Sequence, residues 1–321
     1  MGAKDTKAKE FLSDNERFAD LFNYYLYDGR QVIKAVDLQE QDTTQVLSIF
    51  GADKREIQKQ KWRDILKSAI IKTTEYGIFV LLGVENQSDI HYAMPVKNMV
   101  YDAMEYSSQV NEATKLHRKE KDFTDNAEFL SGFKREDKLT PVITLTVYWG
   151  ADEWDAPRCL HEMIDDKYRA LLQYVDNYHL HLIVPEEIDD FGKFQTSLGA
   201  VLEFIKASKS EALMDAVVND NPMFKQLDNE AVSTINVFTG VLIPVEEKEG
   251  KMDMCKAWND HRMSGVIEGK KEGKEIINQL NICLIKDGRQ DDLIRAASDS
   301  VYQEELIEYY GLDKQEEAVE V

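Results

Sequence analysis

Two carboxylates and one amide, on neighbouring strand-like segments, could together hold a metal ion. Asp64 opens one apolar segment, and the apolar segment after the next turn ends in Glu85, Asn86 and Gln87. Adjacent strands with a short connection are expected to form an antiparallel hairpin, which brings Asp64 close to Glu85. Glu85 and Gln87 are two residues apart on a strand, so their side chains leave the same face of the sheet.

This arrangement predicts metal-assisted chemistry on a phosphate ester. Two carboxylates at one sheet edge repel each other, and a hard divalent cation relieves the repulsion. Mg²⁺ is commonly held by one or two carboxylates together with waters and substrate phosphate oxygens. The ion can activate water and stabilise the leaving oxygen of a phosphodiester. Gln87 would then orient the water or contact the phosphate. The alternative is that all three residues are solvated strand ends.

A helix near the N-terminus presents a further acidic candidate, Asp14. Apolar residues spaced as on one face of a helix predict this element; they are Phe18, Leu21, Phe22 and Tyr25. Asp14 falls on the same stripe one turn earlier, whereas Glu16 and Asp20 are expected to face solvent. Asp14 could therefore point inward as a functional carboxylate, or it could cap the helix N-terminus.

A second helix is expected to begin at Pro95, because proline is favoured in the first turn. Its predicted polar face carries Lys97, Tyr101 and Glu105. Its predicted apolar face consists of Val96, Met99, Val100, Ala103, Met104, Ser107 and Val110.

The order of the elements predicts an α/β fold with a helical appendage. Strands are expected over 141–150 and 179–185, and the pattern after Asp190 is helical. We therefore expect one domain over 1–190 and a mostly helical region over 191–321. The EGK repeat within that region predicts a solvated helix or linker, since glycine weakens a helix.

Composition indicates a protein with a substantial core and an unusual charge balance. The chain has 321 residues, 43% hydrophobic and 31% charged, and a net charge of −21 from 60 acidic and 39 basic residues. This excess of acid counts against non-specific binding of nucleic acid. Basic residues nevertheless cluster locally, over 54–63 and again over 117–121. These clusters could form a local basic groove on an otherwise acidic protein.

Several features predict an intracellular, cytoplasmic protein. Three scattered cysteines form no C-x-x-C pair, as expected in a reducing compartment. The polar N-terminus does not resemble a signal peptide, and no apolar run approaches the ~20 residues that cross a bilayer. The sequence also lacks a phosphate-binding loop, a dinucleotide-binding glycine motif and a G-x-S-x-G elbow.

Four blocks in order along the chain resemble a known family. They are NERFADLFNYYLYDG (15–29), WRDILK (62–67), LLGVENQSDIHYAMPVKNMVYDA (81–103) and PVITLTVYWGADEWDAPRCLHEM (141–163). Together they look like the recombination-promoting nuclease/putative transposase family of the PD-(D/E)XK nuclease superfamily. The EGK-rich tail is also typical of such proteins.

The resemblance implies a restriction-endonuclease-like fold, with a mixed sheet flanked by helices, and DNA cleavage that depends on Mg²⁺ or Mn²⁺. Asp64 and Glu85 match the acidic residues of the motif and are the implied metal ligands. Gln87 stands where the superfamily usually has lysine, and Arg63 stands where proline often precedes the aspartate. Because the superfamily often has another acid on its first helix, the resemblance makes Asp14 a candidate for that role.

The resemblance also implies residues that contact DNA. Lys97 stands where relatives often have arginine, and Lys59, Lys61 and Arg63 lie close to Asp64 in sequence. Each of these could equally be an ordinary surface charge.

Two functions are therefore carried forward. The first is a metal-dependent DNA endonuclease associated with recombination or mobile elements. The second is a catalytically inactive protein with the nuclease fold that binds DNA or protein, because the lysine of the motif is missing. In either case the charged C-terminal helices could mediate homo-oligomerisation.

Overall fold

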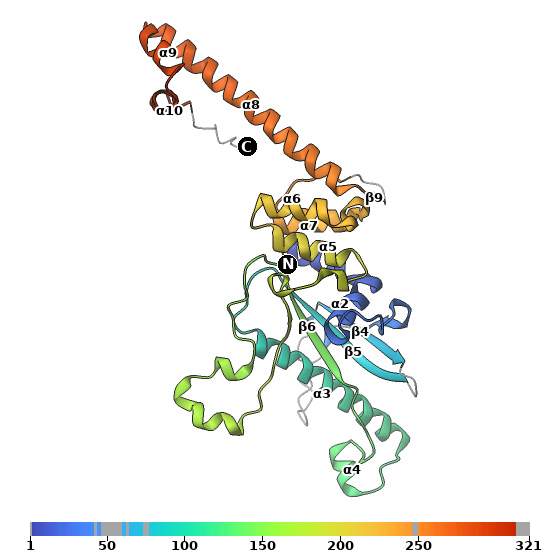
Figure 1. Ribbon diagram of the computed structural model, residues 1–321. Helices are drawn as coiled ribbons and strands as arrows, with labels where there is room; N and C mark the ends of the chain where they lie inside the picture. Colours follow the sequence, from blue (N-terminus) through green and yellow to red (C-terminus); the bar gives the residue numbers. More distant parts are fainter. Residues whose placement is uncertain are drawn as a thin grey trace. The chain divides into compact units, whose positions relative to one another are not determined.

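The protein is described by a computed structural model (Figure 1), which covers residues 2–41, 44–45, 60–61, 64–72, 77–245 and 250–312. The chain divides into two compact units, Met1–Cys255 and Lys256–Val321. The boundary predicted at residue 190 falls inside the first unit. The two units are described separately below.

The first unit is built on a mixed sheet with the strand order β1-β4-β5-β6-β7. Its strands are β1 (Leu38–Glu40), β4 (Ile65–Lys72), β5 (Gly77–Gln87), β6 (Val142–Tyr148) and β7 (His181–Ile183). β1, β4 and β5 are antiparallel neighbours, whereas β6 and β7 run parallel to β5. The predicted α/β class and the predicted β4–β5 hairpin are confirmed.

Two short strand pairs lie outside this sheet. They are β2 (Thr44–Gln45) with β3 (Gln60–Lys61), and β8 (Leu227–Asp228) with β9 (Lys251–Met252).

Helices flank the sheet on both faces (Figure 1). The α-helices of the first unit are α1 (Ala3–Ser13), α2 (Asn15–Tyr27), α3 (Met94–Glu120), α4 (Asn126–Ser131), α5 (Ser197–Ala207), α6 (Glu211–Asp220) and α7 (Asn229–Thr239). Helix α3 packs on β6, and α1 packs on β5 and α7. The two helices cover opposite faces of the sheet. Glu85 of β5 contacts Lys97 of α3, and the preceding residue, Val84, points to the opposite face because side chains alternate along a strand.

Helix α2 forms as its apolar stripe predicts, but its polar residues are placed differently. Asp14 caps the helix and accepts hydrogen bonds from the backbone N–H groups of Glu16 and Arg17, each at 3.0 Å. Asp20, which was expected to face solvent, is buried. Its carboxylate accepts the Thr196 hydroxyl and the backbone N–H groups of Gln195 and Thr196. The prediction for Asp20 was wrong because α5 begins against this side of α2.

Helix α3 turns its polar face to the sheet, which contradicts the predicted orientation. Val100, assigned to the buried face, is 38% exposed, whereas Asn98 and Tyr101 are buried. The reason is that the sheet beneath is polar, since β6 presents Thr144 and Thr146 there. The Asn98 amide donates to the Thr146 hydroxyl at 2.9 Å.

The other face of the sheet carries the main apolar core. Large side chains from the helices and from β5 and β6 are fully buried there; they include Phe11, Phe18, Phe22, Leu82, Leu145, Trp149 and Phe204. Burying one such side chain is worth about 1.5–3 kcal/mol. One cation, Lys67 of β4, is buried among them; its ammonium donates to Asn15 Oδ1 at 2.6 Å and to the Ser13 carbonyl. This lysine ties the α1–α2 connection to the sheet.

The second unit contains α8 (Met254–Lys286), which begins within the first unit, and then α9 (Gln290–Ala296) and α10 (Ser300–Tyr309). Its core is a cluster of Leu280, Leu284, Ala296 and Leu306. The mostly helical character predicted after residue 190 is confirmed. Among the described helices, none combines the length and the apolar character needed to cross a bilayer.

Candidate active site

Asp64 and Glu85 meet where the β4–β5 ladder ends. Ile65 pairs with Val84, so Asp64 stands opposite Glu85. The backbone N–H of Asp64 donates to Glu85 Oε1 at 3.3 Å, and the backbone N–H of Asn86 donates to Asp64 Oδ2 at 2.9 Å. Each carboxylate is therefore held by the backbone of the strand opposite. The hairpin places the two predicted ligands side by side.

Lys97, in the first turn of α3, reaches the same pair. Its Nζ lies 3.2 Å from Glu85 Oε2. Glu85 is only 2% exposed, so its carboxylate has lost most of its contact with water. A buried carboxylate is costly unless it is paired or bonded, and here Lys97 and the Asp64 N–H supply partners. Lys97 thus lies beside the two carboxylates, and its predicted contact with DNA stays a prediction.

The end of β5 is fixed by a contact on the opposite face. The indole Nε1–H of Trp149 donates to Asn86 Oδ1 at 2.9 Å, and the Trp149 backbone N–H donates to the Gln87 carbonyl at 2.9 Å. Gln87 Nε2 donates to the Asn86 carbonyl at 2.8 Å. This bond orients the side-chain amide of Gln87, whose oxygen, Oε1, can accept a hydrogen bond from a ligand.

A cavity of about 310 Å³ opens beside these residues. It is lined by Asp5, Asp64, Asn86, Gln87, Ser88, Asp89, Ile90, His91 and Lys97. Several of these residues were not predicted. Ser88, Asp89 and His91 directly follow the strand, so their position in the sequence could have indicated them. Asp5 comes from α1, and no local pattern connects it with Asp64.

Asp5 contributes an acidic group from the first helix. The Ser88 hydroxyl lies 3.2 Å from Asp5 Oδ1 and 3.4 Å from Asp89 Oδ2. Asp5 therefore brings a third carboxylate to the wall of the cavity, on a helix, where the sequence had suggested Asp14.

Asp14 lies on a different cavity, of about 710 Å³, together with Arg17 and Thr196. Its side chain is exposed and caps α2, as the alternative interpretation predicted. A supporting role for Asp14 at the metal site remains a prediction. Lys59 and Arg63 lie outside the described residues, and only the backbone of Lys61 is described.

The donor set around Asp64 and Glu85 fits a hard divalent cation. Among the described residues that line the cavity, Asp5, Asp64 and Asp89 offer carboxylate oxygens, His91 carries an imidazole and none carries a thiol. Two carboxylates together with water and phosphate oxygens are what Mg²⁺ usually takes. The predicted ligands are thus chemically suited to Mg²⁺ or Mn²⁺.

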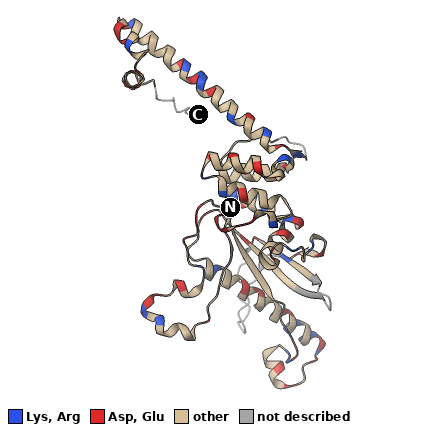
Figure 2. Cartoon of the chain, in the orientation of Figure 1, with Lys and Arg blue, Asp and Glu red and all other residues tan. Residues whose placement is uncertain are grey.

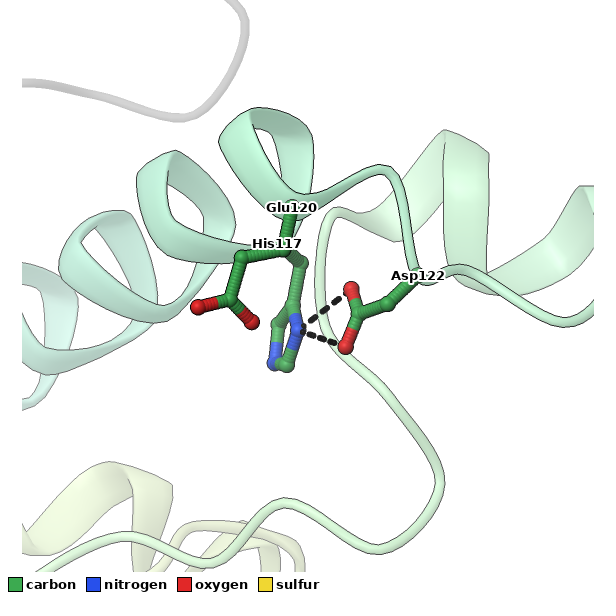
Figure 3. A group of neighbouring side chains, drawn as sticks. All are labelled: His117, Glu120 and Asp122. Atoms are coloured by element: carbon green, nitrogen blue, oxygen red, sulfur yellow. Dashed lines mark hydrogen bonds and ion pairs between the residues drawn. The ribbon is translucent and has the colours of Figure 1, made fainter.

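A second group of side chains lies at the far end of α3 (Figure 3). His117, Glu120 and Asp122 offer ligand atoms within 4.8 Å of one another. The structure shows a charge clamp there: His117 Nδ1 bonds Asp122 at 2.9 Å, and Nε2 bonds Asp137 at 3.1 Å. Lys134 lies 3.3 Å from Asp122.

The charges of these side chains can balance one another without a bound metal ion. Burial lowers the pKa of His117, but its bonds to Asp122 and Asp137 outweigh that effect and raise the pKa above its usual value. The imidazolium and Lys134 then balance two carboxylates. We define these four residues as the His117 clamp.

Comparison with known proteins identifies one family. The family described as "Putative transposase, YhgA-like" matches residues 3–231, which include the whole of the sheet and the cavity beside Asp64. No curated protein and no solved structure matches the chain.

Proposed function

Since the chain belongs to the YhgA-like putative transposase family, we propose that it is a metal-dependent DNA endonuclease associated with recombination or mobile elements. The reaction is hydrolysis of a DNA phosphodiester bond with Mg²⁺, or with Mn²⁺ in its place. We place this reaction in the cytoplasm.

One observation carries the proposal. Glu85 accepts a hydrogen bond from the backbone N–H of Asp64, and Asp64 accepts one from the backbone N–H of Asn86, so the two carboxylates are held side by side. Asp64 and Lys97 line the adjacent cavity, and Glu85 is buried beside them, 3.2 Å from the Lys97 ammonium. Two carboxylates and an ammonium at this position form a site that can receive both a cation and a phosphate. The burial of Glu85 argues against a pair of solvated strand ends.

Each residue has a role in this proposal. Asp64 and Glu85 would hold the metal ion, which when bound supplies charge neutralisation and a more acidic water. Gln87 accepts a hydrogen bond from the attacking water through its free amide oxygen and so orients it. Lys97 donates to a phosphate oxygen and offsets the negative charge that develops there. The superfamily lysine is absent from position 87, and Lys97 supplies a cation from the neighbouring helix.

We also assign the first unit to the PD-(D/E)XK superfamily and its restriction-endonuclease-like fold. The assignment is supported by the mixed sheet, by the placement of the aspartate and glutamate on an antiparallel hairpin, and by the helix that follows β5 and leads to a parallel strand. DNA is the proposed partner, contacted by Lys97 and by the basic segment with Lys59, Lys61 and Arg63.

A nicking assay tests the proposal. Supercoiled plasmid is incubated with the purified protein in Mg²⁺, in Mn²⁺ and in EDTA, beside Asp64→Ala and Glu85→Gln. We expect metal-dependent conversion to open circles by the wild type and loss of at least about a hundredfold in rate for both variants. Glu136→Gln is the matched control, because this exposed carboxylate does not line the cavity.

Two results would contradict the proposal. Nicking that survives Asp64→Ala would show that the site is elsewhere. Absence of nicking in every metal, with binding to DNA retained, would favour the second function, a nuclease-fold protein that binds without cutting.

We further propose that the chain forms a homo-oligomer through its C-terminal helices. Helix α8 exposes apolar side chains that no described residue of its own unit covers, including Met263, Val266 and Ile267. Gly265, Gly269 and Gly273 leave open space along the same helix, where another helix could approach closely. Basic and acidic residues alternate along α8 (Figure 2), which favours pairing between two copies.

A further inference from the structure

The C-terminal end of α3 carries a cluster of cations without acidic partners. Lys115, Arg118 and Lys119 are exposed, and none of them forms an ion pair with another described residue. We call these three residues the α3 basic cluster.

Four acidic residues near the cluster are engaged elsewhere. Asp122 is bonded to His117 (Figure 3), and Asp137 bonds the other nitrogen of the same imidazole. Glu128 accepts hydrogen bonds from Thr124 and from the backbone N–H of Arg135, and Asp125 caps α4. These four acids stabilise the fold around α4. Two further acids of α3, Glu112 and Glu120, are exposed, and Glu120 points about 140° away from the direction of Lys97.

The cluster lies on the same side of α3 as Lys97. An α-helix has 3.6 residues per turn, so Lys115, 18 residues after Lys97, completes about five turns and returns to the same direction. Arg118 and Lys119 lie within about 60° on either side of that direction. The side chains between them within about 40° of this direction are uncharged; they are Tyr101, which is buried, and Met104, Ser108 and Asn111. Glu112 lies at the edge of the face.

The spacing along the helix matches duplex DNA. At 1.5 Å per residue, Lys115 is about 27 Å and Lys119 about 33 Å from Lys97 along the axis. One turn of B-DNA spans about 34 Å, after which a strand returns to the same side of the duplex. A rigid helix of this length can therefore contact phosphates about 8–10 base pairs apart.

We infer that the α3 basic cluster binds the phosphate backbone of duplex DNA about one helical turn away from the phosphate held in the Asp64 cavity. This inference rests on the proposed function and adds the substrate class, a continuous duplex, to it. The length of helix α3 then sets the distance between the two DNA contacts. The His117 clamp contributes by holding the α4 segment beside the end of α3.

Binding measured without cleavage tests this inference. The probe is a fluorescent duplex of about 30 base pairs in EDTA, titrated by anisotropy at several salt concentrations. The test variant is Lys115→Gln/Arg118→Gln/Lys119→Gln. The matched control is Lys34→Gln/Arg169→Gln/Lys251→Gln, which removes three exposed cations from the first unit outside α3. Circular dichroism confirms that both variants are folded.

We expect the test variant to bind at least about tenfold more weakly near 0.1 M salt, and its log–log salt slope to fall by about 2–3. The control should retain wild-type affinity and slope. Wild-type affinity and slope in the test variant would overturn the inference, as would an equal loss in both variants. Failure of the wild type to bind any duplex would overturn it too.

The outcome is separable from that of the proposed function. If the wild type binds as expected but nicks nothing in Mg²⁺ or Mn²⁺, the endonuclease proposal fails and the duplex contact stands. If the wild type nicks DNA and the test variant binds normally, the endonuclease proposal stands and the duplex contact fails.

Discussion

Lys97 places its ammonium 3.2 Å from a carboxylate that is almost completely buried. Nothing local in the sequence distinguishes this lysine from a surface residue, since the contact joins the start of α3 to the end of β5. Sequence could predict Asp64, Glu85 and Gln87, because strand alternation and one hairpin relate them. It could not predict Asp5, which reaches the same cavity from α1.

Replacing Lys97 by glutamine should remove the charged contact to the phosphate. A hydrogen bond to a charged group is worth about 1.5–3 kcal/mol, so we expect plasmid nicking to slow by about 10–100-fold. Lys97→Arg, which keeps the charge, should retain most of the rate. An unchanged nicking rate in Lys97→Gln would contradict this role of Lys97.

Between α3 and the sheet, several contacts are hydrogen bonds between side chains. Asp102 of α3 accepts the Thr144 hydroxyl at 2.6 Å and the Tyr178 hydroxyl at 2.7 Å. Asp102→Ala leaves the buried Thr144 hydroxyl without this acceptor, which costs about 1–3 kcal/mol. The melting temperature should fall by about 3–10 °C.

A second substitution makes the Asp102 prediction specific. Adding Thr144→Val to Asp102→Ala removes both polar partners, and this should recover part of the lost stability. Strictly additive losses in the double variant, measured by thermal melting, would show that the two residues do not interact.

The His117 clamp predicts how stability at the end of α3 depends on pH. The folded pKa of His117 is raised by its bonds to Asp122 and Asp137. Its contribution is therefore fully present below the unfolded pKa of about 6.5, and is lost as pH rises through the folded pKa. The melting temperatures of wild type and His117→Gln should differ more at low pH than at high pH. An equal difference at both, or a rise in wild-type stability on adding Zn²⁺, would contradict the charge clamp.

The positions of helices and strands could be predicted from the sequence better than the side that each helix buries. The β4–β5 hairpin follows from two β-rich runs and a short turn, and α3 follows from Pro95. The buried side of α3 was predicted wrongly, because hydrophobic spacing assumes an apolar surface beneath the helix. The sheet here presents Thr144 and Thr146, so Asn98 is buried instead.

On the scale of the whole molecule, every residue that lines the Asp64 cavity lies in the first unit. A chain ending at Cys255 should therefore retain metal-dependent nicking. It should also lose self-association, because it lacks most of α8 with its exposed apolar residues and open glycines. Light scattering after size exclusion measures the second effect. A truncated chain that stays oligomeric would place the interface in the first unit.

The net charge of the whole molecule does not decide whether the proposed DNA contact can form. The net charge of −21 argues against DNA as a ligand, yet Lys97 and the α3 basic cluster lie on one side of one helix. Net charge is a sum over the whole chain, whereas the binding of a phosphate backbone depends on the charges close to it. Only the structure shows which acids are already engaged.

The most direct measurement of the central claim is the position of a bound metal. Crystals of the protein grown with Mn²⁺ and a short DNA duplex would be examined by anomalous scattering at the manganese edge. We expect a peak bonded to carboxylate oxygens of both Asp64 and Glu85, at about 2.1–2.2 Å, and its disappearance in Asp64→Ala. A peak at His117, Glu120 and Asp122 with none at Asp64 would contradict the account.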